Sequence, residues 1–563
     1  MKSVHIRSRL AVSLSASALA LGAALVLAGT ADPALATECL LDTNNDGVAD
    51  AADTDGGATG TGTDSLACGP AANAAGTSSV ASGDSANAGS DYSVAIGGDY
   101  NGTGTGANAS NEGAIAIGAD ANTPGYYGVA VGSLADATNI YASAFGTDAN
   151  ATGAYTTAVG ANANAGFSLS TASGFAAYAT NDGATAEGAN SLADGQYSTA
   201  IGAGLNTGNG AYAEGNGAIA IGGDTNGDFQ GAYAEGAGSI AMGDNSHAVT
   251  DDSIAIGTGA YADGSTAVGA GSTASGTNTA AFGEGANATG TDATALGEYS
   301  TATGNNVTAV GTGALANNTN STALGDAAEA TGPGSTATGQ NSEASGRGST
   351  ADGLNATASG AGSTATGANS DATGQSSTAN GYLAQATADN TTATGAYADA
   401  TAAGATANGV DALADGTNAS AFGYQSDAGG ANSTALGNSS DASGEASTAT
   451  GFSSEASGPY ATANGAYALA TGVVSTAIGS GSEAQGDYSA VLGDATATWA
   501  AVDGVAIGHN ALADGAQATA VGAGAQATAE STSAFGDNAQ ATNLDATALG
   551  QDTLASGEAS TAI

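Results

Sequence analysis

A glycine closes the same five-residue phrase at a nearly fixed spacing along most of this chain. The phrase reads small residue, then Ser, Thr or Val, then Ala, any residue and Gly, as at residues 321–325 (STALG) and 475–479 (STAIG). From Gly97 to Gly550 there are 32 such glycines, and 26 of the 31 intervals between them are 14 residues. A fixed short period predicts one supersecondary unit stacked on itself.

Each 14-residue unit contains two short stretches that suit an extended chain, separated by turn residues such as Gly, Asn and Asp. A helix is disfavoured, because each interior glycine costs a helix about 1 kcal/mol. Disorder suits the composition but gives no reason to keep a strict period. The chain is therefore predicted to be all-β, a β-solenoid of about 32 coils of 14 residues.

Strand alternation puts Ala323 on one face of its strand and Thr322 and Leu324 on the other. The residue before the glycine is often Leu, Ile, Val or Phe, so one apolar face is left over once the narrow tube is filled with alanine. Self-association would bury that face. Which face points outward stays open. From Thr338 to Asn408 this position is polar in every unit, and it holds Asp352. If the face meets a threefold axis, copies of Asp352 converge there; if it meets solvent, nothing special follows.

The charge is strongly acidic, with 52 Asp and Glu against 4 Lys and Arg. Nucleic acid and anionic lipid are therefore excluded as partners, because binding to phosphate needs Lys or Arg. Two readings stay open: solubility through self-repulsion, or the loading of cations.

The first 36 residues are predicted to be a secretory signal peptide. Lys2, Arg7 and Arg9 precede an apolar stretch over residues 10–28, and Ala34, Leu35 and Ala36 form a small-residue cleavage pattern. The alternative is a transmembrane anchor, which the Ala- and Ser-rich stretch fits less well. The mature chain is thus expected to be exported.

Residues 37–69 are predicted to be a small calcium-binding module closed by a disulfide. Cys39 and Cys68 are the two cysteines, and an exported chain meets an oxidising compartment in which they can pair; two unpaired thiols are the alternative. Between them, residues 42–53 fit a calcium-loop template of alternating oxygen ligands around Gly47. The loop resembles a thrombospondin type 3 repeat, whereas the alternative is an acidic spacer. The proposed calcium ligands are Asp42, Asn44, Asp46, Val48, Asp50 and Asp53.

Residues 70–90 are rich in Ala, Gly and Ser and are expected to be a transition segment. Residues 79–83 (SVASG) already fit the repeated phrase, so the alternative is that the first coil starts there. From residue 91 to residue 563, phrases such as 93–97 (SVAIG), 113–118 (GAIAIG) and 253–257 (SIAIG) resemble the repeats of YadA-like trimeric autotransporter adhesin heads. The resemblance implies a left-handed parallel β-roll that assembles as a homotrimer. It also implies a place on the outer membrane of a Gram-negative bacterium, with adhesion to host matrix, cells or abiotic surfaces, autoaggregation and biofilm formation.

The stalk and the barrel anchor of that family are not in this sequence. The chain stops at Ile563, one residue before the next expected glycine. It is therefore expected to be a fragment cut within a repeat, and an anchorless secreted fibre is the alternative.

An enzyme is not expected. The only histidines after the leader, His247 and His509, lie far apart in the repeat, and the many Ser and Thr residues lack a nearby base. Ice binding through a column of threonines is a further alternative, although its second column is mixed.

The long intervals are predicted to be insertions that bulge from the coils, and tyrosines gather near them. Exposed tyrosine makes large contacts at low entropic cost. Stacking along the coils for stability is the alternative. The candidate ligand-contact residues are Tyr100, Tyr126, Tyr127, Tyr212 and Tyr233.

Overall fold

The protein is seen in a computed structural model that describes residues 37–38, 56–100, 102–204, 210–225, 227 and 230–563. These residues form parallel β-structure in about 35 turns of roughly 14 residues, with no helix among them. The predicted all-β solenoid is therefore confirmed. The chain divides into two units, residues 1–120 (unit 1) and 121–563 (unit 2), which are described separately.

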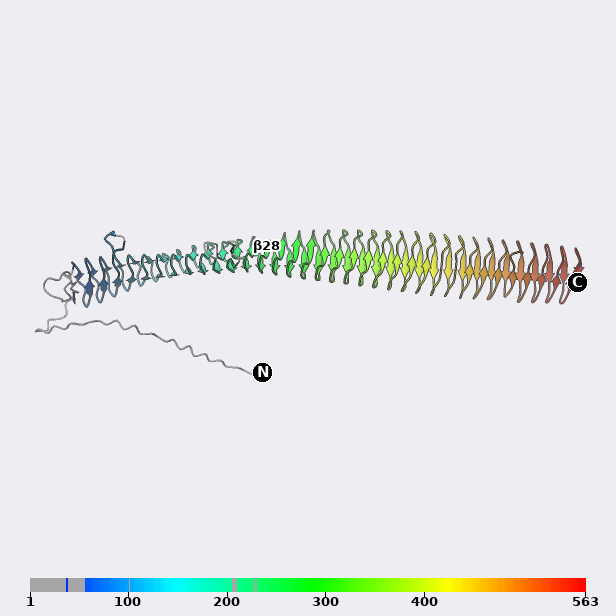
Figure 1. The fold of residues 1–563 in the computed structure, drawn as a ribbon, viewed down its shortest axis with the longest axis horizontal. Helices are drawn as coiled ribbons and strands as arrows, with labels where there is room; N and C mark the ends of the chain where they lie inside the picture. Colours follow the sequence, from blue (N-terminus) through cyan, green and yellow to red (C-terminus); the bar gives the residue numbers. More distant parts are fainter. Residues whose placement is uncertain (1–36, 39–55, 101, 205–209, 226, 228–229) are drawn as a thin grey trace, which may run out of the picture. The chain divides into compact units, whose positions relative to one another are not determined.

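In unit 2, every coil adds one three-residue strand to a first sheet. The series begins with β11 (Val129–Val131), β13 (Ser143–Phe145) and β15 (Thr157–Val159), and it ends with β67 (Thr547–Leu549) and the two-residue β69 (Thr561–Ala562). Neighbouring strands are parallel and keep identical phrases in register, so that Thr322, Ala323 and Leu324 of β37 (Thr322–Leu324) pair with Thr336, Ala337 and Thr338 of β39 (Thr336–Thr338). Figure 1 shows these coils stacked in a single column.

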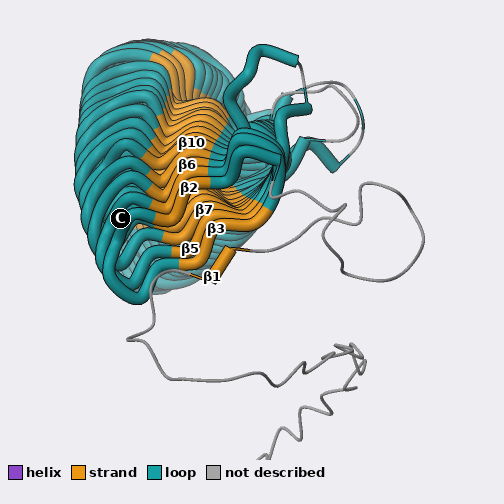
Figure 2. Tube along the Cα trace, turned by 90° about the vertical axis from the view of Figure 1, so that its left-hand side faces the viewer, coloured by secondary structure: helices purple, strands orange, loops and turns teal. Residues whose placement is uncertain are grey.

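The other stretch of each coil forms a second sheet of shorter strands. It runs from β10 (Asn122–Thr123) and β12 (Asp136–Ala137) to β50 (Leu413–Ala414), and again from β54 (Glu455–Ala456) to β68 (Leu554–Ala555). Between these two parts, Asp427 and Asp441 keep only isolated bridges. Figure 2 shows the strands of successive coils aligned, with turns joining the two sheets.

Unit 1 has the same two-sheet coils. One sheet contains β1 (Thr37–Glu38), β3 (Leu66–Cys68), β5 (Val80–Ser82), β7 (Val94–Ile96) and β9 (Ile115–Ile117). The other contains β2 (Thr59–Gly60), β4 (Asn73–Ala74), β6 (Asn87–Ala88) and β8 (Asn108–Ala109). Residues 70–90, which were expected to be a transition segment, thus already form coils, because Ala74, Ala81 and Ala88 supply the buried side chains that the interior needs.

The interior is a file of small side chains. The middle alanine of nearly every first-sheet strand and the last alanine of most second-sheet strands are fully buried, as Ala323 and Ala330 are, and β59 (Ala490–Leu492) has the buried Val491 in that place. The flanking residues point outward: Thr322 is half-buried and Leu324 is 49% exposed. The predicted alternation is confirmed, and the question that the sequence left open is answered, since alanine lies inside and the residue before the glycine lies outside.

The serine of the repeated phrase holds the corner that precedes the first-sheet strand. Its side chain is buried. In many coils its hydroxyl donates to the carbonyl oxygen three residues earlier, as from Ser321 Oγ to Asn318 O at 2.6 Å and from Ser79 Oγ to Gly76 O at 2.6 Å, whereas in others, among them Ser335 and Ser475, the buried hydroxyl has no hydrogen-bond partner. Where the bond forms, the hydroxyl satisfies a buried carbonyl, which favours Ser and Thr at this position.

Two glycines of the same corner differ in what a larger side chain would meet. A Cβ on Gly346 would overlap the carbonyl oxygen of Gly360 in the next coil, whereas a Cβ on Gly348 would meet nothing within 4 Å. Gly348 has a φ of 64°, and in later coils Asn418 and Asn432 take the same corner position at 56° and 59°. Asparagine tolerates this left-handed region well.

The same substitution two residues apart should therefore give opposite results. We expect Gly346→Asn to lower the free energy of unfolding by about 2 kcal/mol, because the backbones of two coils must move apart. Gly348→Asn should leave it within about 0.5 kcal/mol of the parent protein. Chemical denaturation of both variants measures the difference, and equal losses would contradict the close approach of coils at Gly346.

Candidate adhesive surfaces

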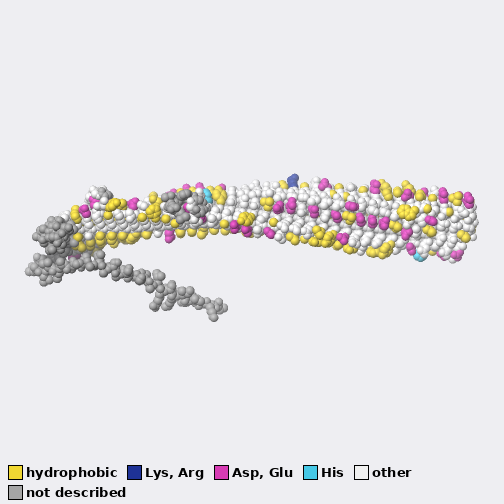
Figure 3. All heavy atoms as spheres, in the orientation of Figure 1, with side chains coloured by type: hydrophobic (Ala, Val, Ile, Leu, Met, Phe, Trp, Pro, Cys, Tyr) yellow, Lys and Arg dark blue, Asp and Glu magenta, His cyan; other side chains and the backbone are white. Residues whose placement is uncertain are grey.

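The most extended surface feature of unit 2 is the column formed by the third residue of each first-sheet strand, here called the outer column. It has thirty rungs from Val131 to Leu549, one in each coil. Most rungs are apolar, and many are well exposed, including Phe145 at 40%, Leu296 at 47% and Leu436 at 49%. In the coils of unit 2 before β28 (Tyr261–Asp263), Figure 3 shows hydrophobic side chains in a row along one edge. Monomeric proteins rarely expose apolar patches of more than a few hundred Å².

A second feature is a stack of tyrosines at the corner that precedes the first sheet. The ring of Tyr127 stacks on that of Tyr141 with centroids 5.5 Å apart, and Tyr141 stacks on Tyr155 at 5.3 Å. All three have a φ between 54° and 59° and are 45–56% exposed. Ring stacking offsets the cost of a left-handed backbone at a bulky residue. Their ring faces cover one another, so the edges and hydroxyls face solvent.

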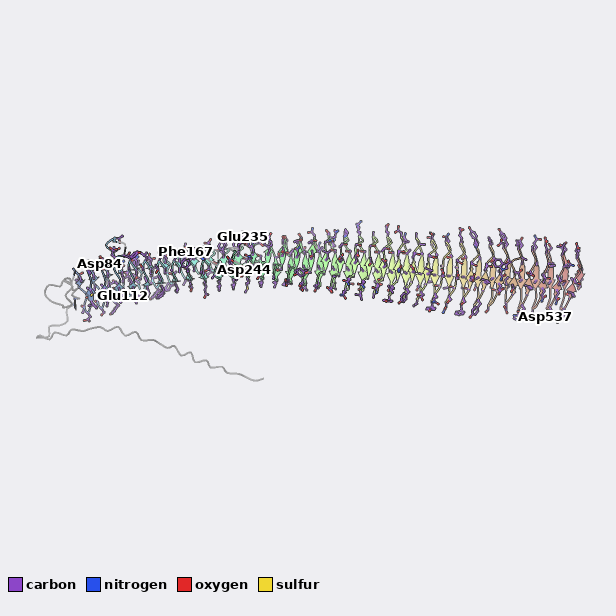
Figure 4. All side chains as sticks on the ribbon, viewed as in Figure 1. Asp84, Glu112, Phe167, Glu235, Asp244 and Asp537 are labelled. Atoms are coloured by element: carbon purple, nitrogen blue, oxygen red, sulfur yellow. The ribbon has the colours of Figure 1, made fainter. Side chains whose placement is uncertain are left out.

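The same part of unit 2 carries further exposed aromatic residues. Tyr126 is 51% exposed and adjoins Tyr127, and Phe167 is 51% exposed. Figure 4 shows Phe167 projecting from the outside of the coils. Residues 126–167 thus present a cluster of aromatic side chains.

A third feature is an aromatic column on the second sheet. Tyr212 of β22 (Tyr212–Ala213) stacks on Tyr233 of β24 (Tyr233–Ala234) with centroids 4.9 Å apart and planes 3° apart. Tyr233 stacks on His247 at 4.6 Å, and His247 meets the edge of Tyr261 at 5.6 Å. Longer intervals precede β22 and β24, but the strands still pair in register, so that the stack is continuous.

Two glutamates sit beside this column. The hydroxyl of Tyr233 donates to the carboxylate of Glu214, and His247 Nε2 lies 3.1 Å from Glu235 Oε2. Burial, with the charge of Glu214 next in importance, raises the pKa of Tyr212 to about 12 and also raises that of Tyr233. Both hydroxyls thus stay protonated at neutral pH and can donate hydrogen bonds. Figure 4 shows Glu235 on the outside of the coils.

Acidic residues form a column on the second sheet farther along unit 2. Asp427 pairs with Asp441, and Asp441 pairs with Glu455, so carboxylates stand in successive coils. Burial raises the pKa of Asp427 to about 6, and the charges of Asp441 and Asp415 add to the effect. Elsewhere in this column amides occur instead, and Asn122 Nδ2 donates to Asp136 Oδ1 at 3.0 Å.

Stability should therefore depend on the protonation of Asp427. Its pKa in the folded chain lies above the value near 4 of an unfolded aspartate, so the folded state binds the proton more tightly. The resulting penalty is fully present above about pH 7 and disappears as the pH falls through 6 toward 4. We expect Asp427→Asn to stabilise unit 2 at pH 7.5 by on the order of 1 kcal/mol, a value reduced because solvent screens this half-buried group.

The thermal midpoint of both proteins between pH 4 and pH 8 measures this effect. The difference should vanish near pH 4. The exposed Glu445→Gln is the control for loss of one charge, and it should shift the midpoint much less. An equal gain at pH 4 and pH 7.5 would contradict the assignment.

Comparison with known families decides what these coils are. The family model described as "YadA head domain repeat (2 copies)" matches 19 segments that together cover more than half of the chain. The segments are residues 61–83, 74–99, 104–135, 137–163, 179–204, 234–260, 260–286, 288–314, 316–342, 344–370, 372–398, 400–426, 414–440, 428–454, 442–468, 470–496, 500–525, 527–553 and 541–563. The chain belongs to the YadA head repeat family. These are therefore the coils of an adhesin head.

Two further comparisons add little. Among solved structures, the chain is similar to the collagen-binding domain of Yersinia adhesin YadA, at 38% identity over 21% of this chain and 66% of that chain, with a TM-score of 0.20. The chain thus covers slightly less than two thirds of that structure. A search of curated protein sequences finds no match.

The predicted ligand-contact residues of this YadA-type head lie in three separate parts of the structure and differ in exposure. In unit 1, Tyr100 is 75% exposed on an insertion whose turn is held by Asp99, which accepts from the backbone of Gly102 at 2.7 Å. Tyr126 and Tyr127 lie in the exposed aromatic cluster. Tyr212 and Tyr233 come together, although stacking leaves them only partly exposed.

Several aromatic residues were missed by the sequence analysis: Tyr141, Tyr155, Phe167, His247 and Tyr261. The signal for Tyr141 and Tyr155 was their spacing of 14 residues from Tyr127, and the same spacing links Tyr233, His247 and Tyr261.

The proposed calcium ligands and Cys39 lie outside the described residues. Cys68 is described; it is half-buried and occupies the outward third position of β3. Within the described part of the chain, no group of three or more His, Cys, Asp or Glu side chains could hold a metal ion. The same part contains no helix that is long and apolar enough to cross a membrane.

Proposed function

We propose that this chain is the head of a bacterial surface adhesin, exported to the cell surface, that assembles as a homotrimer and attaches the cell to host matrix, to other cells or to abiotic surfaces. The observation that carries the proposal is the outer column of a YadA-family head: a long, exposed and largely apolar file on an otherwise acidic protein. Burial of that file between copies removes it from water.

The aromatic cluster of residues 126–167 supports a second part of the proposal, contact with the ligand. Once the outer column is buried between copies, these corner side chains still face solvent. Tyrosine and phenylalanine give large contact areas with few rotatable bonds. Arg347 is the only Lys or Arg in the described residues, so a ligand held by salt bridges would have to be basic itself.

Calcium binding by residues 42–53 and a disulfide between Cys39 and Cys68 are further parts of the proposal. Both concern the segment that precedes the coils. The sequence pattern of that segment supports them, and calorimetric titration of the purified protein with calcium tests the first.

The test of the main proposal is the mass of the purified chain in solution, followed by its attachment to surfaces coated with matrix proteins. We expect three times the chain mass and retention on at least one coated surface, with retention lost when Tyr126, Tyr127 and Tyr141 are all replaced by serine. A monomer would contradict the trimer. A trimer that holds to no matrix protein, cell or bare surface would contradict the adhesive role.

Ice binding is the alternative to exclude in the same preparation. Paired threonines face outward together in β39, but the next strand, β41 (Thr350–Asp352), ends on Asp352. A flat, regular threonine surface is thus interrupted, and we expect no thermal hysteresis.

A further inference from the structure

The outer column of unit 2 is not uniform, and its pattern does not repeat. The column has thirty rungs from Val131 to Leu549. Along the chain they form seven runs: three apolar, two polar, nine apolar, six polar, two apolar, two polar and six apolar rungs. The polar rungs are Ser173, Glu187, Thr338, Asp352, Thr366, Asn380, Thr394, Asn408, Thr450 and Asn464. All are half-buried or exposed, so the chain itself does not cover them.

A second copy of this chain is the partner whose spacing matches this column. The rungs are one coil apart, because neighbouring strands pair in parallel with identical phrases in register, as Ile201 pairs with Ile221 across a 20-residue interval. The strands that flank the longer intervals still pair in register, so the rung spacing is unchanged. Another copy has the same spacing and the same pattern of rungs, so side chains can match along the whole length.

We propose that the polar runs of the outer column fix the axial register in which copies of this chain associate. The inference rests on the proposed trimer and adds how its register is set. In register, every polar rung faces polar rungs and every apolar rung faces apolar rungs. A slip of one coil creates a mismatch at each of the six boundaries between runs, and a slip of two coils creates twelve mismatches.

Mismatched rungs are unfavourable because they remove water from hydrogen-bonding atoms that the contacts within one copy leave unsatisfied. Along one copy, Thr338 Oγ1 donates to Asp352 Oδ1 at 2.6 Å, and Thr366 Oγ1 donates to Asn380 Oδ1 at 3.0 Å. Facing another polar rung, these groups can bond across copies or through water. Facing leucine or phenylalanine, they would be dehydrated without replacement.

Two rungs work against the in-register state. Glu187 and Asp352 each bring identical carboxylates together when copies align. The hydroxyl of Thr338 partly compensates for Asp352, and the remaining polar rungs are neutral. The eight neutral rungs therefore favour the in-register alignment, and the two acidic rungs oppose it.

Polar residues placed within an apolar interface are known to specify register in coiled coils at a cost in stability. The same physics applies here to a column of coils. An entirely apolar outer column would associate more strongly, but every one-coil slip would be nearly as good as the correct alignment.

The experiment uses the full chain with Cys39 and Cys68 replaced by serine and one spin label at Ser480→Cys, an exposed corner position. The mass in solution comes first, because a monomer defeats the proposed trimer rather than this inference. Given a trimer, pulsed electron resonance should give one narrow distance between labels. A variant with all ten polar rungs changed to leucine should give several distances, since slips shift the labels by about 4.8 Å per coil.

A control keeps the pattern and changes the residues: Thr338→Asn, Thr366→Asn and Asn380→Thr should leave the single distance unchanged. A second variant moves the six-rung polar run by two coils toward the N-terminus, with Val310→Thr, Leu324→Asn, Thr394→Val and Asn408→Leu. It should trimerise with itself but form mixed trimers with the parent chain about tenfold less often than random assortment predicts. A single distance from the ten-leucine variant, or free mixing of the moved run with the parent, would overturn the proposal.

Discussion

Replacing Ala323 by leucine is expected to lower the free energy of unfolding of the surrounding coils by about 3 kcal/mol or more. Ala323 is fully buried, and its partners in the adjacent coils, Ala309 and Ala337, are fully buried too. The largest fully buried side chains among the described residues are Val307 and Val491. Leucine is longer than either, and overpacking in a tightly filled interior costs about 1–3 kcal/mol, and more where the backbone must separate.

The loss should be local, because each coil contacts mainly its neighbours and a solenoid is nearly one-dimensional. Hydrogen exchange should therefore show faster opening in the coils around β37, with distant coils unchanged. Ala361→Leu is the matched control, since Ala361 is exposed at a corner, and its exchange should match that of the parent protein. If both variants open the coils equally, the interior is not as narrow as described.

The sequence was sufficient to predict the coil and its two faces, because both depend on local periodicity. The glycine spacing set the coil length, and alternation within a three-residue strand placed Ala323 opposite Thr322 and Leu324. Side-chain volume decides which face of the strand lies inside. Alanine fills the interior in coil after coil, and a column of Leu, Ile and Phe would not fit there.

The aromatic columns were harder to predict, because they depend on which residues come into register after insertions. Tyr212 and Tyr233 are separated by 21 residues, so a fixed period of 14 does not align them. They stack because β22 and β24 still pair in register across the longer interval. Burial is the main cause of the raised pKa of Asp427, and register adds to it, because Asp441 lies one coil away.

The transition expected over residues 70–90 differs from the structure for a related reason. The segment is rich in Ala, Gly and Ser and poor in large apolar residues, although residues 79–83 (SVASG) already fit the repeated phrase. The interior needs only small side chains, however, and Ala74, Ala81 and Ala88 meet that need.

Placing two carboxylates in the longest apolar run of the outer column should dissociate the proposed trimer. Leu296 and Leu324 are 47% and 49% exposed in the single chain, and both belong to the run of nine apolar rungs from Ile201 to Leu324. The double variant Leu296→Asp and Leu324→Asp would bring six carboxylates to the interface of three copies. An unpaired charge that loses its water costs several kcal/mol, so we expect association to weaken by about 100-fold or more.

Mass in solution as a function of protein concentration measures this change. The matched control is Leu354→Asp with Val410→Asp, which adds the same charge at corner positions that are 45% and 44% exposed in the single chain but lie off the outer column. Because each copy already carries a large negative charge, general repulsion could also separate copies, and the control isolates that effect. Dissociation by the outer-column pair alone assigns the interface to this face. Equal dissociation by both pairs would mean that charge, and not the outer column, limits assembly.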